Sequence, residues 1–169
     1  MGRQIAKEVV FAGIAAALLI VIQVALSFLP NIELVSLLII LFTKNFGKRT
    51  LFAIYTFVMA EGLIYGFGIW FFMYLYVWAV LFFAAWLFRR MEHILGWTLL
   101  SGTFGLLFGA LCTITYIVIN GWSTGIAGFI SGIPYDLMHC AGNITAMLIL
   151  YKPLDNVLKR TKESMFPEK

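Results

Sequence analysis

The chain has 169 residues, of which 62% are hydrophobic and only 12% are charged, and its formal net charge is +4. Soluble domains carry about 25% charged residues, so this composition predicts a membrane protein. At roughly 20 apolar residues per crossing, the length allows about six helices and excludes a separate catalytic or ATP-binding domain. A water-filled barrel is also excluded, because the apolar runs are continuous and do not alternate with a period of two.

Six apolar segments, separated by charged clusters or by Gly and Pro, are each expected to form a membrane-crossing helix. They cover residues 9–29, 32–43, 51–65, 69–88, 95–119 and 133–151. The first is too long for the apolar core of a signal peptide, so we expect a retained helix. The second and third are too short for a hydrocarbon core of about 30 Å, so loops or other helices should shelter them. Residues 120–132 should form an ordered outer loop, with the sixth helix beginning at Pro134.

The twelve Lys and Arg residues lie at the two ends of the chain and in the connections after the second and fourth segments. The positive-inside rule therefore places both termini and these two basic connections in the cytoplasm. The net charge indicates orientation and contact with anionic membrane lipid, and no basic stripe indicates nucleic-acid binding. We expect one domain over residues 1–169, an all-α membrane protein with a bundle of six transmembrane helices in the cell membrane.

Several polar side chains fall inside the apolar segments, in the half of the membrane that this topology places outside. They are Gln23, Glu33, Glu61, Asp136, His139 and Asn143. Glu33 and Asp136 also fit a helix start, where a carboxylate stabilises the helix dipole, and His139 also fits a hydrogen bond to a backbone carbonyl. However, ionisable groups at this depth are costly, and the three polar residues of the sixth helix, two of them ionisable, share one face. Together they predict a polar cavity.

The same half is rich in Tyr and Trp, namely Tyr65, Trp70, Tyr74, Tyr76, Trp78, Tyr116, Trp122 and Tyr135. Most of them fit an interfacial belt, but the cytoplasmic side has fewer such residues. The excess suits a site that stacks a flat ring and forms hydrogen bonds to its edge. The candidate substrate-binding residues are Glu33, Glu61, Tyr65, Trp70, Tyr74, Trp122, Asp136, His139 and Asn143.

No catalytic signature in the sequence competes strongly with a binding role. Ser131-Gly132 lacks the preceding Gly of a membrane serine-protease turn, and Asp136 has no companion aspartate at membrane depth. There is no Walker loop, so transport would need an ion gradient or another subunit. Cys112 and Cys140 show neither a disulfide pattern nor metal-ligand spacing. We expect no catalytic residue, metal or cofactor.

Small residues form two strips at helical spacing. Ala12 and Ala16 lie four residues apart in the first segment, where another helix could approach closely, although ordinary internal packing is an alternative. Gly102, Gly105 and Gly109 form a similar strip in the fifth segment. We assign that strip to packing within the bundle.

These features resemble the substrate-binding S component of an energy-coupling factor (ECF) vitamin transporter, over the whole chain. The most specific parts are Phe28-Leu29-Pro30-Asn31-Ile32-Glu33-Leu34-Val35, and Ile133-Pro134-Tyr135-Asp136-Leu137-Met138-His139-Cys140-Ala141-Gly142-Asn143 leading to Leu150-Tyr151-Lys152-Pro153-Leu154. The resemblance implies that Ala12 and Ala16 dock on a transmembrane coupling protein carrying two cytoplasmic ATPases. It also implies that the vitamin binds near the outer surface, beneath a gate formed by residues 28–33.

The charges narrow the expected substrate. The outer halves of the segments contain no Lys or Arg, which disfavours an anionic vitamin. Glu61 and Asp136 suit a cationic, zwitterionic or neutral ring, so a vitamin B6 form is favoured, followed by thiamine or its pyrimidine precursor, then riboflavin or cobalamin. Two other classes remain open: a stand-alone proton-coupled carrier and an intramembrane enzyme.

Overall fold

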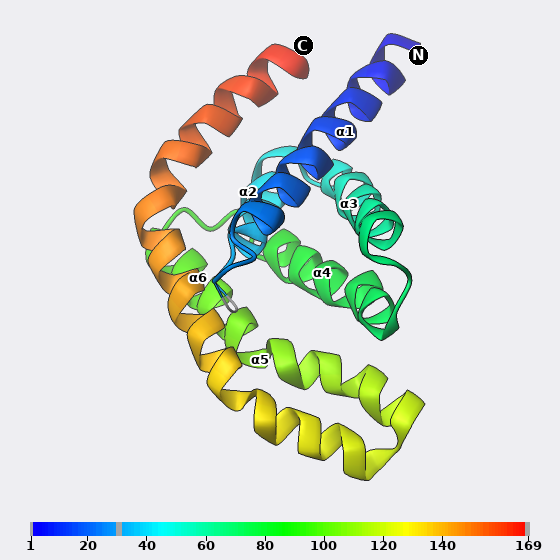
Figure 1. Cartoon of the computed structure of the whole chain (residues 1–169). Helices are drawn as coiled ribbons and strands as arrows, with labels where there is room; N and C mark the ends of the chain where they lie inside the picture. Colours follow the sequence, from blue (N-terminus) through cyan, green and yellow to red (C-terminus); the bar gives the residue numbers. More distant parts are fainter. Residues whose placement is uncertain (1, 30–31, 168–169) are drawn as a thin grey trace.

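The computed structural model describes residues 2–29 and 32–167, and in this part of the chain it contains six α-helices and no strand (Figure 1). In chain order they are α1 (Gly2–Ala25), α2 (Val35–Phe46), α3 (Arg49–Tyr65), α4 (Ile69–Leu87), α5 (Ile94–Asn120) and α6 (Trp122–Met165). The all-α prediction is confirmed. Each predicted apolar segment corresponds to one helix, and both chain ends lie at the same end of the molecule (Figure 1).

Helix α2 forms the centre of the fold. All its side chains except Lys44 are buried, and it contacts each of the other five helices. Its 12 residues span about 18 Å, less than a hydrocarbon core of about 30 Å. The expected sheltering of the second segment is therefore confirmed. The third segment does not follow this expectation, because Phe52 and Leu63 on the short helix α3 are exposed.

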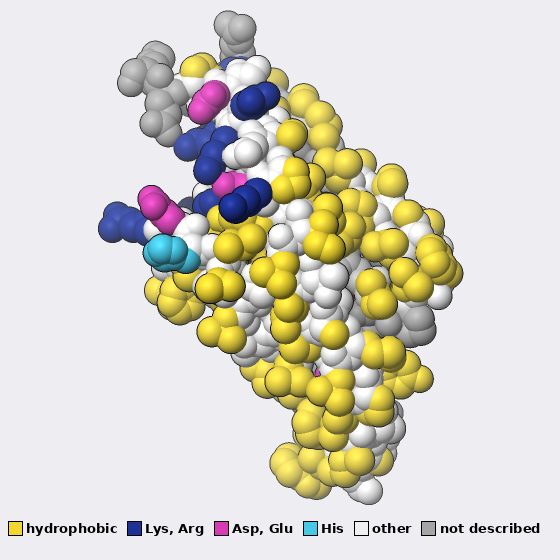
Figure 2. Space-filling model, turned by 90° about the vertical axis from the view of Figure 1, so that its left-hand side faces the viewer, with side chains coloured by type: hydrophobic (Ala, Val, Ile, Leu, Met, Phe, Trp, Pro, Cys, Tyr) yellow, Lys and Arg dark blue, Asp and Glu magenta, His cyan; other side chains and the backbone are white. Residues whose placement is uncertain are grey.

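Three helices in the described part of the chain are long and apolar enough to cross a membrane: α1 from Gln4 to Ala25, α4 and α5. Large apolar side chains also cover much of the surface (Figure 2). The Lys and Arg side chains visible in Figure 2 gather at the end that carries both termini in Figure 1. This distribution is typical of a helical membrane protein.

Helix α6 is longer than the sequence predicts. It extends over 44 residues from Trp122 to Met165, so the predicted outer loop at 120–132 and the helix start at Pro134 are wrong. The chain turns at Gly121, whose φ of 84° favours glycine. Pro134 and Pro153 lie inside the helix, where each removes one backbone hydrogen bond, and α6 is curved (Figure 1). Helices α5 and α6 form a hairpin whose tip projects beyond the other helices (Figure 1).

The glycine strip of α5 packs against α6, as expected. A Cβ atom added at Gly102 would meet Ile144, and one at Gly109 would meet the Asp136 carboxylate. A Cβ atom at Gly105 would lie 2.9 Å from the backbone nitrogen of Cys140. The missing side chains therefore let the two helices approach closely, and the prediction of internal packing is confirmed.

Replacing Gly105 with Ala should lower the stability of this hairpin by about 1–3 kcal/mol, because the new methyl group presses on α6 backbone that must shift. Gly128→Ala is the matched control, since a Cβ atom there has no neighbour within 4 Å. It should be stabilising by about 0.5–1 kcal/mol through helix propensity. Thermal unfolding of the purified protein in detergent measures both. Equal melting temperatures for the two variants would contradict the close packing of α5 on α6.

The alanine strip of α1 points inward. Ala12 and Ala16 are only 8% and 2% exposed, in a helix that packs mainly against α3. In this structure Ala12 and Ala16 thus have the internal-packing role that the sequence left open, and they offer no exposed surface for the implied docking. In the middle of α1, Gly13 and Ala17 are small and exposed, and they lie four residues apart beside exposed Val10 and Val21.

Candidate functional site

A cavity of about 340 Å³ lies where α1 ends and α2 begins, at the ends of these helices that point away from the chain termini. Helices α1, α4, α5 and α6 and the connection between α1 and α2 contribute to its wall. Its lining residues are Gln23, Leu26, Ser27, Leu29, Ile32, Glu33, Tyr74, Trp78, Phe108 and His139. Three candidate residues from the sequence, Glu33, Tyr74 and His139, therefore share one cavity.

Glu33 connects the start of α2 to α6. Its carboxylate accepts hydrogen bonds from the Ser36 backbone N–H at 2.9 and 3.1 Å and from the Ser36 hydroxyl at 2.5 Å. The helix-start interpretation of Glu33 thus holds. The same carboxylate lies 3.0 Å from Nε2 of the buried His139. Glu33 therefore both stabilises α2 and pairs with an imidazole from a residue 106 positions away.

Glu61 lies behind the cavity wall and is held by Gln23. The Gln23 Nε2 atom donates a hydrogen bond to Glu61 Oε2 at 2.9 Å, which joins α1 to α3. Glu61 is buried, and Gln23 is one of the lining residues. Glu61 is therefore connected to the cavity through Gln23.

Aromatic rings form one wall of the cavity. The Tyr74 ring packs edge-on against Trp78 and Trp70, with centroids 5.3 and 5.4 Å away. Trp78 in turn lies 5.7 Å from Phe108, which is 5.0 Å from the His139 ring. This run of rings from α4 to α6 fixes the imidazole and offers flat apolar surface to a ligand.

Three buried polar atoms at or beside the cavity have no hydrogen-bond partner within residues 2–29 and 32–167. They are Trp78 Nε1, His139 Nδ1 and Glu61 Oε1. Buried donors and acceptors are normally satisfied, so a cluster of unsatisfied ones is typical of a site that binds a polar ligand. Trp78 contributes a donor, and Glu61 an acceptor.

Other candidate residues lie elsewhere. Asp136 Oδ1 accepts a hydrogen bond from the Gly109 N–H at 3.0 Å, and Asn143 Nδ2 donates to the Ser101 carbonyl at 3.0 Å. Neither residue lines the cavity, because both face the glycine strip of α5.

The remaining aromatic candidates are also outside the lining set. Tyr65 and Trp122 are 56% and 70% exposed, which fits the interfacial belt instead of the site. Trp70 reaches the cavity only through Tyr74. The proposed gate at 28–33 contributes Leu29, Ile32 and Glu33 to the lining, while Pro30 and Asn31 lie outside the described residues.

Sequence reasoning left Trp78 and Phe108 out of the site and named Gln23 only as a polar companion. Trp78 lies four residues after Tyr74, and this spacing on a helix was the available signal. Phe108 gave no signal, because it is one of 16 phenylalanines.

Within the described residues, no three His, Cys, Asp or Glu side chains gather closely enough to hold a metal ion. Comparison of the chain with protein-family models, curated proteins and solved structures finds no match.

Proposed function

We propose that the chain is the substrate-binding S component of an ECF-type importer, crossing the cell membrane six times with both termini in the cytoplasm. The observation that carries this proposal is the cavity of about 340 Å³ that unites Gln23, Glu33, Tyr74, Trp78 and His139 beneath the α1–α2 connection. Buried polar groups and aromatic walls around a small cavity are features of a ligand site. Because the sequence has no nucleotide-binding loop, the energy for import in this proposal comes from separate ATPase subunits.

The substrate that best fits the cavity is a small cationic, zwitterionic or neutral ring, with a vitamin B6 form first and thiamine second. None of the described lining residues is Lys or Arg, whereas Glu33 lines the cavity and Glu61 lies behind it. A protonated ring nitrogen facing a carboxylate keeps its proton. The volume is at the lower end of the range for small-molecule sites, which disfavours cobalamin most strongly.

In this proposal, four of the lining residues have a role in binding. Tyr74 and Trp78 provide surfaces for a flat ring, and the Trp78 indole N–H can donate to a hydroxyl of the ligand. Glu33 can accept a hydrogen bond from a ring N–H or a hydroxyl, while His139 holds its carboxylate in place at 3.0 Å. The chain then binds and releases its substrate unchanged, without chemical conversion.

Mass spectrometry of small molecules that remain bound to the purified protein tests the proposed ligand class. We expect a vitamin B6 form or another non-acidic ring vitamin to be recovered in about equimolar amount. Recovery of an acidic vitamin instead would contradict the charge argument. Recovery of a chemically altered product after incubation with substrate would favour the intramembrane enzyme.

Docking on a transmembrane coupling protein should involve the exposed face of α1 around Gly13 and Ala17, because the Ala12 and Ala16 strip is buried. A Cβ atom at Gly13 would have no neighbour within 4 Å, so the chain itself tolerates bulk there. Ala17→Trp should therefore prevent assembly with the coupling protein and the two ATPases without reducing ligand binding by the isolated chain.

Co-purification from cells that express the whole transporter measures this assembly. Val118→Trp is the control, because Val118 is exposed on α5, away from α1. Normal assembly of Ala17→Trp would exclude this face of α1 as the docking surface.

The Glu33–His139 pair keeps a second candidate function open, a stand-alone proton-coupled carrier. An imidazole paired with a carboxylate can exchange a proton as the surroundings change. Reconstitution of the chain alone in liposomes separates the two functions. Substrate accumulation driven by a pH gradient without ATPases would favour the carrier, whereas accumulation that needs the partners and ATP supports the S component.

A further inference from the structure

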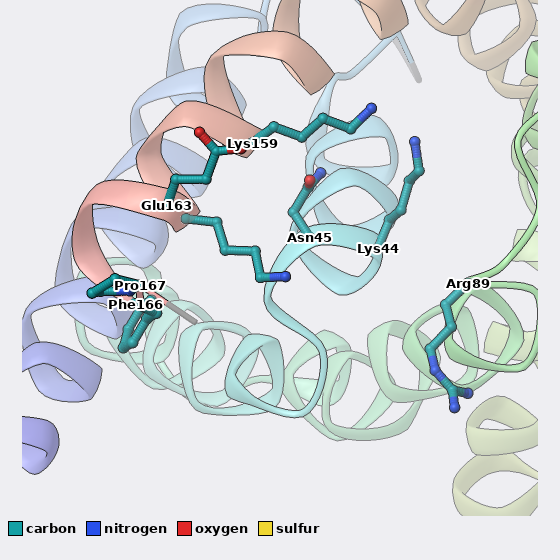
Figure 3. Close-up of a pocket in the computed structure, with 8 residues that line it drawn as sticks. Lys44, Asn45, Arg89, Lys159, Glu163, Phe166 and Pro167 are labelled. Atoms are coloured by element: carbon teal, nitrogen blue, oxygen red, sulfur yellow. The ribbon is translucent and has the colours of Figure 1, made fainter. Parts of the chain in front are cut away.

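A strongly basic cavity lies at the opposite end of the molecule from the proposed vitamin-binding cavity. It has a volume of about 560 Å³ and is bounded by α2, α6 and the α4–α5 connection. Figure 3 shows Lys44 of α2 and Lys159 of α6 extending into the space between these helices. A second hollow of about 780 Å³ shares Lys44, Arg89 and Lys159 with the first. These two hollows together are called the basic cavity below.

The basic cavity has an excess of positive charge. Its cationic lining residues are Lys44, Arg89, Arg90, Lys152, Lys159 and Lys162, and its acidic ones are Glu92, Asp155 and Glu163. Asp155 is shared, because Lys44 and Lys159 lie 2.8 and 2.9 Å from the same carboxylate oxygen. One carboxylate therefore balances two lysines, and the remaining positive charge suits an anion.

Arg89 presents the most suitable group for a phosphate. Its guanidinium packs over the Trp86 ring at 4.6 Å and donates one hydrogen bond to the Trp86 carbonyl at 3.0 Å. Within the described residues no carboxylate lies at ion-pair distance from it. The stacked guanidinium thus keeps further N–H donors in a planar fork, the geometry that binds phosphate oxygens.

An apolar groove of about 430 Å³ between α4 and α5 adjoins the basic cavity. Met91 lines both, so the two spaces meet at the α4–α5 connection. The groove runs along α5 from Gly96 to Leu111, which is about 22 Å at 1.5 Å per residue. Exposed Leu99 and Leu107 lie along it, so the groove is open to the surrounding lipid.

We infer that the basic cavity and the adjoining groove together bind one anionic phospholipid. The phosphate is held by Arg89, whose guanidinium Figure 3 shows directed away from Lys44 and Lys159. These two lysines add positive charge to the same cavity, and an acyl chain follows the groove past Met91 and Leu107. The pairing of a basic hollow with an elongated apolar groove favours a lipid over a free phosphate compound, which would use the basic cavity alone. This site does not depend on the proposed vitamin-binding function.

Native mass spectrometry of the delipidated full chain in detergent tests the site. Phosphatidylglycerol and phosphatidylcholine with identical acyl chains are titrated, and one tightly bound phosphatidylglycerol is expected. Arg89→Gln should weaken phosphatidylglycerol binding about fivefold and leave phosphatidylcholine unchanged, because one cation near a headgroup contributes about that factor. The matched control is Arg160→Gln, which removes the same charge from an exposed residue of α6 outside the cavity lining.

A groove variant completes the experiment. Leu107→Trp should weaken binding of both lipids by filling the acyl-chain path, and a melting temperature close to that of the unmodified chain checks its folding. Equal losses for Arg89→Gln and Arg160→Gln would overturn the site in favour of diffuse attraction. Full displacement of phosphatidylglycerol by inorganic phosphate, with no effect of Leu107→Trp, would overturn the lipid in favour of a free phosphate ligand.

Discussion

Replacing Glu33 with Gln is expected to weaken binding of a vitamin B6 form about 10- to 150-fold, the effect of losing a hydrogen bond to a charged group. Glu33 lines the cavity and is the carboxylate that pairs with His139 at 3.0 Å. Gln keeps an oxygen that can accept the Ser36 N–H, so the start of α2 should hold. Isothermal titration calorimetry with pyridoxine and with thiamine measures the change, and the melting temperature checks folding.

Asp136→Asn is the matched control for this experiment, because it also replaces one carboxylate with an amide. Asp136 does not line the cavity, and its carboxylate is bonded to the Gly109 N–H. The variant should therefore retain affinity within about threefold, as expected for a site outside the binding lining. A larger loss of affinity in Asp136→Asn than in Glu33→Gln would move the ligand from the cavity to the α5–α6 interface.

The sequence predicts α4 well because its ends are marked by residue types. The segment expected at 69–88 is observed at Ile69–Leu87, after Gly66 and Gly68 and before Arg89. Helix α6 shows the limit of this reasoning. The continuous apolar run ends near Lys152, but the helix continues to Met165. There, charged pairs such as Asp155 and Lys159 and the packing of Leu154 and Leu158 against the core support it.

The candidate site was only partly predictable from the sequence, because tertiary packing decides which side chains of a helix face reach the cavity. The spacing of Asp136, His139 and Asn143 correctly indicates a shared face of α6, but spacing cannot show which neighbour covers each turn of that face. The glycines of α5 draw Asp136 and Asn143 into close packing, while His139 alone reaches Glu33. Tyr and Trp raise the same difficulty, since an exposed Trp122 and a cavity-lining Trp78 have the same residue type.

The second large effect is expected at the basic cavity. There, Asp155→Asn should lower the free energy of unfolding by about 3 kcal/mol, because breaking a buried ion pair costs about that much. Asp155 is buried beyond the apolar part of α6 and lies 2.8 Å from Lys44. Its other carboxylate oxygen accepts a hydrogen bond from Asn45 at 2.9 Å. The substitution leaves the Lys44 charge with the Tyr151 hydroxyl as its remaining hydrogen-bond partner among the described residues.

Glu8→Gln is the control for this comparison, because it breaks an ion pair that is about one-third exposed on both sides. The Glu8–Arg49 distance is 3.2 Å. Exposed pairs contribute about 0.2–1 kcal/mol, so its loss should be much smaller than that of Asp155→Asn. Chemical unfolding of the protein in detergent at pH 7 compares the two variants. A similar loss in both would show that the Asp155–Lys44 pair is energetically equivalent to a surface pair.

The stability difference between the unmodified chain and Asp155→Asn should also depend on pH, which tests the role of the Asp155 charge more specifically. Burial alone would raise the pKa of the Asp155 carboxyl, but hydrogen bonds from Lys44, Asn45 and Lys159 outweigh it and hold the pKa below its ordinary value. A carboxyl with a depressed pKa stabilises the folded state above its unfolded pKa of about 3.9 and loses that contribution as the pH falls through the folded value. The stability difference between the unmodified chain and Asp155→Asn should therefore be full at pH 7 and narrow only below about pH 4. A difference that already narrows between pH 7 and pH 5 would show that Asp155 is not held in its charged form by these three partners.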